Sequence, residues 1–230
     1  MRKCLWLFAA GFAFLFCVLG PTNADVISTI GTQHFTVGNT YTTGAFNTAV
    51  AGQPAPFNTF CGSDTSSNCS ASWTFDYTIP GGSTISGATL TLGILDIDSA
   101  AAGNQIASFT LDGTDNLTAL MNTASEGLNS GAGAPNSQYD ILTISIPSSD
   151  FTDLASGTAT FALTLQGPGL GVLGTTTDNG AGLDFSTLDI ATVATAAPEP
   201  PASMLLLAGL TGLGAMQLLA MRRRRTSDQI

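Results

Sequence analysis

Short stretches of alternating apolar and polar residues occupy the middle of the chain. In the clearest one, Trp73, Phe75, Tyr77 and Ile79 alternate with polar residues up to Pro80-Gly81-Gly82. The other candidate strands are 26–30, 35–41, 89–94, 107–111, 142–146, 160–165 and 183–193. A period of two with closely spaced turn residues predicts antiparallel sheet with one buried face. A two-sheet, jelly-roll-like sandwich is the economical way to bury so many half-apolar strands, so we predict an all-β domain.

Helical patterns are scarce. Residues 116–122 favour one or two helical turns, and residues 149–154 favour a capped turn. Glycine-rich stretches at 126–134 and 167–182 are typical of surface loops, where ligand contacts often gather on a rigid scaffold.

The amino-terminal segment has the pattern of a secretory signal. Arg2 and Lys3 precede 17 apolar residues, 4–20, and small residues follow at Thr22 and Ala24. This order predicts a signal peptide over 1–24, handled by the export translocon and cut by signal peptidase after Ala24. The alternative is a retained membrane anchor.

A second apolar segment lies near the carboxyl end. Residues 202–221 carry no charge, and as a helix these 20 residues would be about 30 Å long, the thickness of a bilayer core. Four basic residues follow directly: Arg222, Arg223, Arg224 and Arg225. Positive charge holds that end in the cytoplasm, which predicts a transmembrane helix over 202–221 and an outward-facing domain over 25–197.

The residues before this helix are Pro198, Glu199 and Pro200. Prolines hold the backbone extended and accessible to a protease. A Pro-Glu-Pro motif, an apolar helix and an arginine cluster, in that order over about 197–225, resemble the PEP-CTERM sorting signal of Gram-negative bacteria. The resemblance implies that 198–230 is a sorting signal and that exosortase processes the protein after a transient stay in the inner membrane. It also implies release or re-attachment at the surface, commonly in bacteria that make exopolysaccharide. A plain proline-rich linker before an anchor is the alternative.

The predicted mature domain has an unusual charge balance. Residues 25–197 contain 13 Asp, one Glu and no Lys or Arg, a formal charge of -14 over 173 residues, the size of one domain. Nucleic acid is excluded as a partner because no residue can neutralise phosphates. An anionic polysaccharide would be repelled unless a divalent cation bridged it, whereas a neutral one would not. Solubility in a salty exterior is an equally good reason for the charge.

Two cysteines remain after removal of the signal peptide, Cys61 and Cys69. In an oxidising exterior an isolated pair this close favours a disulfide that closes a polar loop. Zinc would need two further ligands, and His34 is the one histidine in the sequence.

Asp96 and Asp98 suggest a metal site. They continue the face that carries Leu90, Leu92 and Ile94, because residues two apart in a strand point the same way. Two carboxylates that point into the core with no cation nearby are costly to bury unless they bind a metal ion. Calcium is the natural candidate, because it takes oxygen ligands. We expect Asp112 in the same site, and Asn104 and Asp115 would complete a shell if the next hairpin returned alongside. The alternative is that the strand has left the core and both carboxylates are solvated.

The function that these features predict is that of a non-enzymatic surface or extracellular matrix protein associated with exopolysaccharide. Tyr41 and Tyr139 are the aromatic residues expected on the surface for sugar contacts, whereas Trp73 is expected in the core. The alternative is a secreted glycan-active enzyme that uses Asp96 and Asp98. An ice-surface binder would need a flat threonine face, and Thr89-x-Thr91 and Thr158-x-Thr160 are too short to form one.

Overall fold

A computed structural model describes residues 23–99, 104–126, 137–171, 174–195 and 210–212. The described residues from 23 to 194 form one compact unit. Its helices are α1 (Thr43–Ala49), α2 (Thr118–Glu126), η1 (Ser148–Asp150) and α3 (Phe151–Leu154). Its strands are β1 (Asn23–Gly31), β2 (Phe60–Cys61), β3 (Ser70–Asp76), β4 (Ser83–Leu95), β5 (Ile106–Leu111), β6 (Asp115–Asn116), β7 (Tyr139–Ser145), β8 (Thr158–Leu165), β9 (Leu170–Gly171), β10 (Gly174–Thr175) and β11 (Ala181–Ala194).

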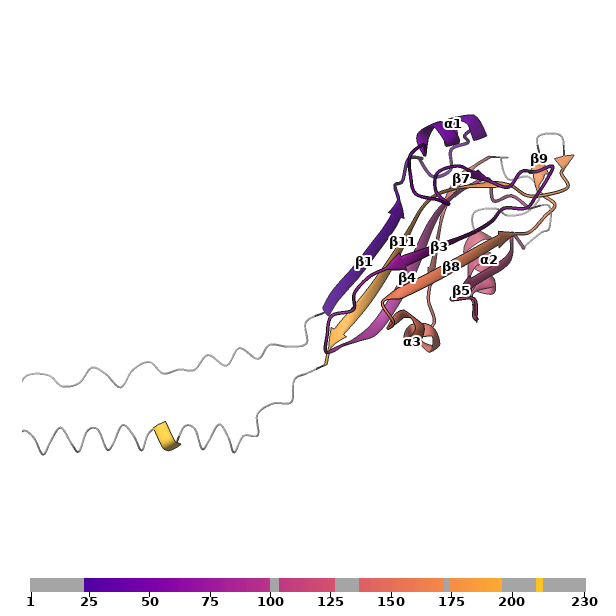
Figure 1. The fold of residues 1–230 in the computed structure, drawn as a ribbon. Coiled ribbons are helices and arrows are strands. Elements are labelled where there is room, and N and C mark those ends of the chain that lie inside the picture. Colours follow the sequence, from indigo (N-terminus) through magenta and orange to yellow (C-terminus); the bar gives the residue numbers. More distant parts are fainter. Residues whose placement is uncertain (1–22, 100–103, 127–136, 172–173, 196–209, 213–230) are drawn as a thin grey trace, which may run out of the picture. The chain divides into compact units, whose positions relative to one another are not determined.

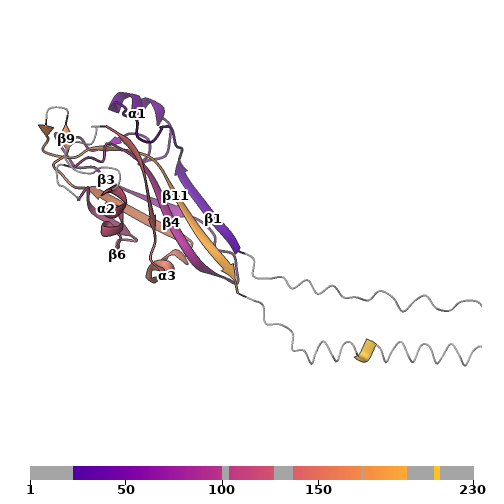
Figure 2. The ribbon, with the colours of Figure 1, turned by 180° about the vertical axis from the view of Figure 1, so that it is seen from behind.

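Two large antiparallel sheets and the small antiparallel pair β9-β10 form the described part of the domain, which confirms the predicted all-β class. One sheet has the order β1-β11-β4-β7, with β2 beside β11, and the other has the order β3-β8-β5-β6. The first and last long strands are therefore neighbours, as Figures 1 and 2 show from opposite sides. We call the sheet that contains β1 and β11 the first sheet.

The two sheets share one core. It is built from the alternating apolar residues that the sequence pattern identifies, such as Leu90 and Leu92 of β4 and Phe109 of β5. Trp73 is 4% exposed and packs against Phe161 with ring centroids 6.2 Å apart, as expected for a core residue. One face of each long strand is thus removed from water, which is the main stabilising contribution to a fold of this kind.

A segment between β1 and β3 departs from the prediction. Residues 35–41 form no strand, apart from one bridge between Thr40 and Gln138, and α1 follows directly. The Thr42 hydroxyl accepts a hydrogen bond from the Ala45 amide and so caps this helix. The segment crosses the outer face of the first sheet and packs there as a second apolar cluster of Phe35, Phe46, Val50, Leu95 and Tyr139.

The terminal signals lie almost entirely outside the described residues. Within the described ranges, no helix combines the length and the hydropathy needed to cross a bilayer. Of the predicted transmembrane segment 202–221, the structure describes only residues 210–212, which are helical. Strand β1 begins at Asn23, so cleavage after Ala24 would leave Asp25 as the first residue of that strand.

Candidate functional site

Four aspartates are buried in the domain. Asp96 and Asp98 are each 5% exposed, and Asp140 and Asp184 are fully buried. The described part of the chain contains no lysine or arginine, so none of these carboxylates has a basic partner from either residue type. A buried carboxylate without a cation must accept hydrogen bonds, hold a proton or bind a metal ion.

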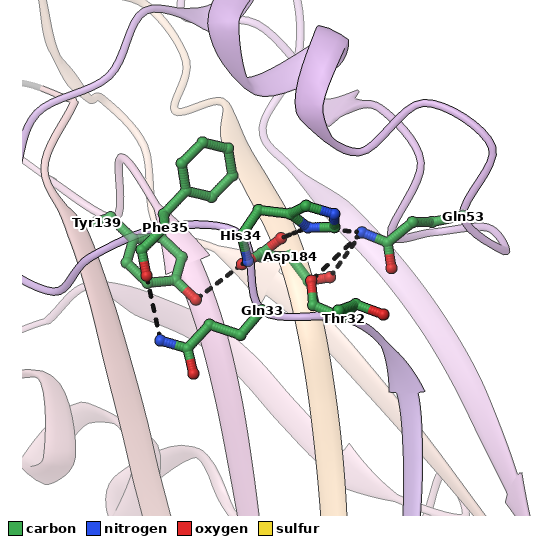
Figure 3. Close-up of polar contacts among 7 residues, drawn as sticks. All are labelled: Thr32, Gln33, His34, Phe35, Gln53, Tyr139 and Asp184. Carbon is green, nitrogen blue, oxygen red and sulfur yellow. Dashed lines mark hydrogen bonds and ion pairs between the residues drawn. The ribbon is translucent and has the colours of Figure 1, made fainter.

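Asp184 accepts hydrogen bonds from three groups, which Figure 3 shows together. The Tyr139 hydroxyl donates to Oδ2 at 2.9 Å, and the His34 backbone amide donates to the same oxygen at 2.9 Å. His34 Nδ1 lies 2.9 Å from Oδ1. Both carboxylate oxygens therefore have a partner, and three segments far apart in sequence meet at this one side chain.

Backbone irregularities place these groups. The pairing of β11 with β4 shifts by one residue between Leu183 and Phe185. Asp184 is the extra residue of this bulge, so its side chain does not follow the regular alternation of the strand. Gly93 of β4 lies beneath the Tyr139 ring: a Cβ there would stand 2.3 Å from the Tyr139 hydroxyl oxygen. Gly31, with φ +81, ends β1 and lets the chain turn toward His34. The absence of side chains at Gly93 and Gly31 thus allows the Asp184 contacts.

The tautomer of His34 follows from its neighbours. A carboxylate only accepts, so the Nδ1 proton points to Asp184. The Gln53 amide nitrogen, 3.2 Å from Nδ1, then donates to the backbone oxygens of Thr32 and Asp184, each at 3.5 Å. Burial, followed by the nearby Asp184 carboxylate, raises the pKa of Tyr139, so this phenol stays protonated and keeps donating.

The arrangement of His34 and Asp184 is that of a base and its orienting acid. Among the described residues, no hydroxyl or thiol is hydrogen-bonded to the other ring nitrogen of His34. The contacts support a positioning role, in which Asp184 fastens residues 32–35 across the outer face of the first sheet. Tyr139 is fully buried here, so the prediction that it lies on the surface is wrong, while Tyr41 is half-buried.

Asp96 and Asp98 lie together at one end of the sandwich. Strand β4 ends at Leu95, so neither Asp96 nor Asp98 belongs to it. Asp96 adopts a left-handed backbone conformation with φ 68. The pair is nevertheless buried, and each of the two carboxylates affects the pKa of the other. The expectation of a strand continuing through Asp98 was wrong, and so was the alternative of a solvated pair.

A third carboxylate, Asp64, faces this pair closely enough to affect its ionisation. It lies in the loop closed by the Cys61–Cys69 disulfide, which is present as predicted. Its Oδ1 accepts from the Gly180 amide at 3.0 Å, and its backbone oxygen accepts from the Asp178 amide at 3.1 Å. Sequence analysis missed Asp64, although its place between two linked cysteines was a usable signal.

The electrostatics of the pair reflect this crowding. Burial, followed by repulsion from Asp96 and Asp64, raises the pKa of Asp98 to about 8. Burial raises the pKa of Asp96 as well, opposed by the Ser137 backbone amide, which donates to Asp96 Oδ1 at 2.8 Å. Near neutral pH and without a cation, this pair therefore retains a proton.

Three buried oxygen atoms at this end of the domain have no hydrogen-bond partner: Asp98 Oδ2, Asn179 Oδ1 and Asp140 Oδ2, since Asp140 of β7 pairs with Ile94 near the end of β4. Asn179 is held beside the same loops, since its backbone oxygen accepts from the Cys69 amide and its backbone amide donates to Asn68. Carboxylate, amide and backbone oxygens are the ligands that calcium prefers. The described residues gather no three His, Cys, Asp or Glu side chains close enough to hold a metal by themselves, so amide and backbone oxygens would have to contribute.

The remaining residues of the predicted metal site lie elsewhere. Gln105 directly precedes β5, and its side-chain oxygen accepts a hydrogen bond from the Ser99 amide. The beginning of β5 is therefore the end of that strand that lies near Asp98. Asp112 follows the other end of β5. Six residues of strand span about 17 Å, so Asp112 lies far from the Asp98 end of the strand. Its Oδ1 accepts a hydrogen bond from the Thr160 amide. Asn104 is exposed, and Asp115 interacts with Asp153, which raises its pKa. The structure thus brings Asp96 and Asp98 together and leaves Asp112 apart.

The sorting residues Pro198, Glu199 and Pro200 and the arginines 222–225 lie outside the described residues. A scan against models of protein families matched none, and a search of curated proteins found no significant similarity.

Proposed function

We propose that this protein is an exported, non-enzymatic surface or extracellular matrix protein, sorted by exosortase and associated with exopolysaccharide. The observation that carries the proposal is the ordered carboxyl-terminal signal, Pro198-Glu199-Pro200, apolar segment and arginine cluster, attached to a domain without lysine or arginine. The localisation is transient anchoring in the inner membrane by residues 202–221, followed by the cell surface or matrix.

The proposed architecture is a jelly roll. In its support, eight strands divide into β1-β11-β4-β7 and β3-β8-β5-β6. Apart from the adjacent pair β5 and β6, consecutive strands of this set alternate between the sheets, in the way that two Greek keys produce. This architecture places loops at both ends and leaves broad sheet faces, which suits a binding protein.

Calcium is the proposed ion, held chiefly by Asp96 and Asp98. Support comes from their burial without a lysine or arginine partner and from the unpartnered oxygens of Asp98 and Asn179. Bound calcium would supply the positive charge that the domain lacks, and it would allow an acidic glycan to be bridged to the protein.

The carboxylate pair fits a metal better than glycoside cleavage. Cleavage uses two acids about 5 to 9.5 Å apart on either side of the bond. Asp96 and Asp98 are each 5% exposed, which leaves little surface at which a sugar could reach both carboxylates.

Retention on the host's own exopolysaccharide, measured with calcium and with chelator, tests the proposal. We expect retention of the exported protein in at least one condition, and loss with chelator if calcium bridges an acidic polymer. No retention under either condition would contradict the association. Intact-mass measurement tests the sorting: the external form should lack residues 202–230, and a full-length external form in cells with active exosortase would contradict it.

A further inference from the structure

The outer face of the first sheet is divided into two parts. At one end, residues 32–60 cover it, because Phe35 and Phe46 pack against Tyr139 of β7. Toward the other end the face is open, and four threonines from four strands stand in one row. The register pairs Thr29 with Thr187, Thr187 with Thr91, and Thr91 with Thr143. Sequence analysis found no regular threonine face, because these residues become neighbours only through strand pairing.

The row is a hydroxyl surface. Thr29 and Thr187 oxygens lie 2.9 Å apart, and Thr91 and Thr143 oxygens lie 3.2 Å apart. Each hydroxyl has one donor and two acceptor positions, so every pair keeps a donor and several acceptors for a ligand. Four strands at about 4.8 Å spacing give a row about 14 Å long, which accommodates an extended chain better than a single small molecule.

A shallow hollow adjoins the row on the same face. The next register line along the strands is Ile27, Asp189, Thr89 and Ser145, and the one after it contains Asp25, Ala191 and Gly87. Asp25 and Asp189 line the hollow, together with the small residues Gly87, Ala88 and Ala191 and with Thr89. Ile27 stands beside it with 64% of its surface exposed.

We propose that this open face binds a neutral polysaccharide chain, an inference that rests on the proposed function and names its binding surface. Sugar hydroxyls would donate to Asp25 and Asp189, in the charge-assisted bonds that are the stronger kind. The exposed Ile27 offers an apolar contact for the carbon-bound hydrogens of a sugar ring. If cleavage occurs after Ala24, one positive α-amino group is added at the hollow beside the two carboxylates of Asp25 and Asp189. The net charge of the hollow then stays negative, which disfavours an anionic chain.

The features of the hollow distinguish this ligand from an ice surface. A flat lattice would require the regular row to continue, whereas Asp189 and the exposed Ile27 interrupt it on the adjacent line. The outer face of the second sheet carries a matched hydroxyl pair, Thr74 and Thr160, whose oxygens are also 2.9 Å apart. That pair lies outside the hollow and provides the control.

The test uses the exported protein and the neutral fraction of the host's exopolysaccharide in affinity electrophoresis. Gly87→Gln fills the hollow, and a Cβ at Gly87 would meet only the Ala191 Cβ, at 3.8 Å, so the backbone tolerates it. Thr29→Val with Thr187→Val removes hydroxyls while keeping shape and strand preference. We expect each of these to weaken retardation at least tenfold, and Thr74→Val with Thr160→Val to change it less than twofold.

The outcomes separate the two proposals. Wild-type binding that survives both open-face variants overturns this inference and leaves the matrix function intact. No wild-type binding to any fraction of the polysaccharide contradicts the function itself. Thermal hysteresis that the open-face variants abolish while polysaccharide binding persists would assign the face to ice. Retention of polylysine in place of the polysaccharide, lost at high salt, would assign it to a cationic partner.

Discussion

Asp184 and the Asp96–Asp98 pair bury carboxylates in a domain without lysine or arginine, yet their surroundings differ. Asp184 receives donors from Tyr139 and His34 at both of its oxygens. Asp98 keeps an unpartnered oxygen, and its pKa is raised to about 8 by burial and by the nearby negative charges of Asp96 and Asp64. The protein itself supplies hydrogen-bond donors to both oxygens of Asp184, whereas Asp98 requires a proton or a bound cation from the solvent.

Removal of Asp184 should have the largest effect on stability. Asp184→Ala leaves the Tyr139 hydroxyl and the His34 amide without their acceptor, and each orphaned buried donor costs about 1–3 kcal/mol. We expect the free energy of unfolding to fall by about 3 kcal/mol in urea denaturation of the exported protein. Asp76→Ala, at an exposed position of β3, is the control and should change it by less than about 0.5 kcal/mol. Equal effects of the two would refute the structural role of Asp184.

Calcium should stabilise through the other carboxylates. An ion that binds only the folded state adds about 2.7 kcal/mol when its concentration is a hundred times Kd. Thermal unfolding with calcium and with chelator should show this increase in the wild type and in Asp112→Asn, because Asp112 lies at the far end of β5. Asp98→Asn should abolish it. A calcium effect that persists in Asp98→Asn would place the ion elsewhere.

Two glycines of β4 allow the covered and the open part of the first sheet to be compared: Gly93 lies in the covered part and Gly87 in the open part. Gly93→Ala drives a Cβ into the Tyr139 hydroxyl and the Phe185 ring, and such overpacking costs about 1–3 kcal/mol. Gly87→Ala meets only an ordinary contact with Ala191, so it should be neutral or stabilise by about 0.5 kcal/mol. Denaturation of both variants measures the difference, and a tolerated Gly93→Ala would contradict the close approach of Tyr139.

The pH dependence should come from the Asp98 side. Its folded pKa of about 8 lies above the unfolded value of about 3.9, so between these values the folded state holds a proton that the unfolded state has lost. With chelator, stability should therefore fall as pH rises from about 4 to 8 and level off above, with a slope of at most about 1.4 kcal/mol per pH unit. Asp98→Asn should flatten this slope, and calcium should stabilise more as pH rises, because it competes with the proton. A slope unchanged in Asp98→Asn would assign it to another group.

The local pattern of the sequence determined the strands and the disulfide. Alternation at Trp73–Phe75 and Leu90–Leu92 identifies core positions because side-chain direction in a strand has a period of two, whatever the strand's partner. Cys61 and Cys69 are close enough in sequence to meet without help from the rest of the fold. The same reasoning failed at residues 35–41, where Gly38, with φ +80, turns the chain and Phe35 packs against α1 instead.

Only the tertiary structure decided which distant residues meet. Asp184 contacts Tyr139 and His34 because of a bulge and a glycine, and Asp64 affects the pKa of Asp98 from a separate loop, and neither arrangement leaves a periodic signal in the sequence. Asp112 separated from Asp96 because the hairpin after β4 entered the other sheet. The row of Thr29, Thr187, Thr91 and Thr143 exists because strand register aligns residues from four strands, and register is set by the burial of whole faces rather than by the threonines themselves.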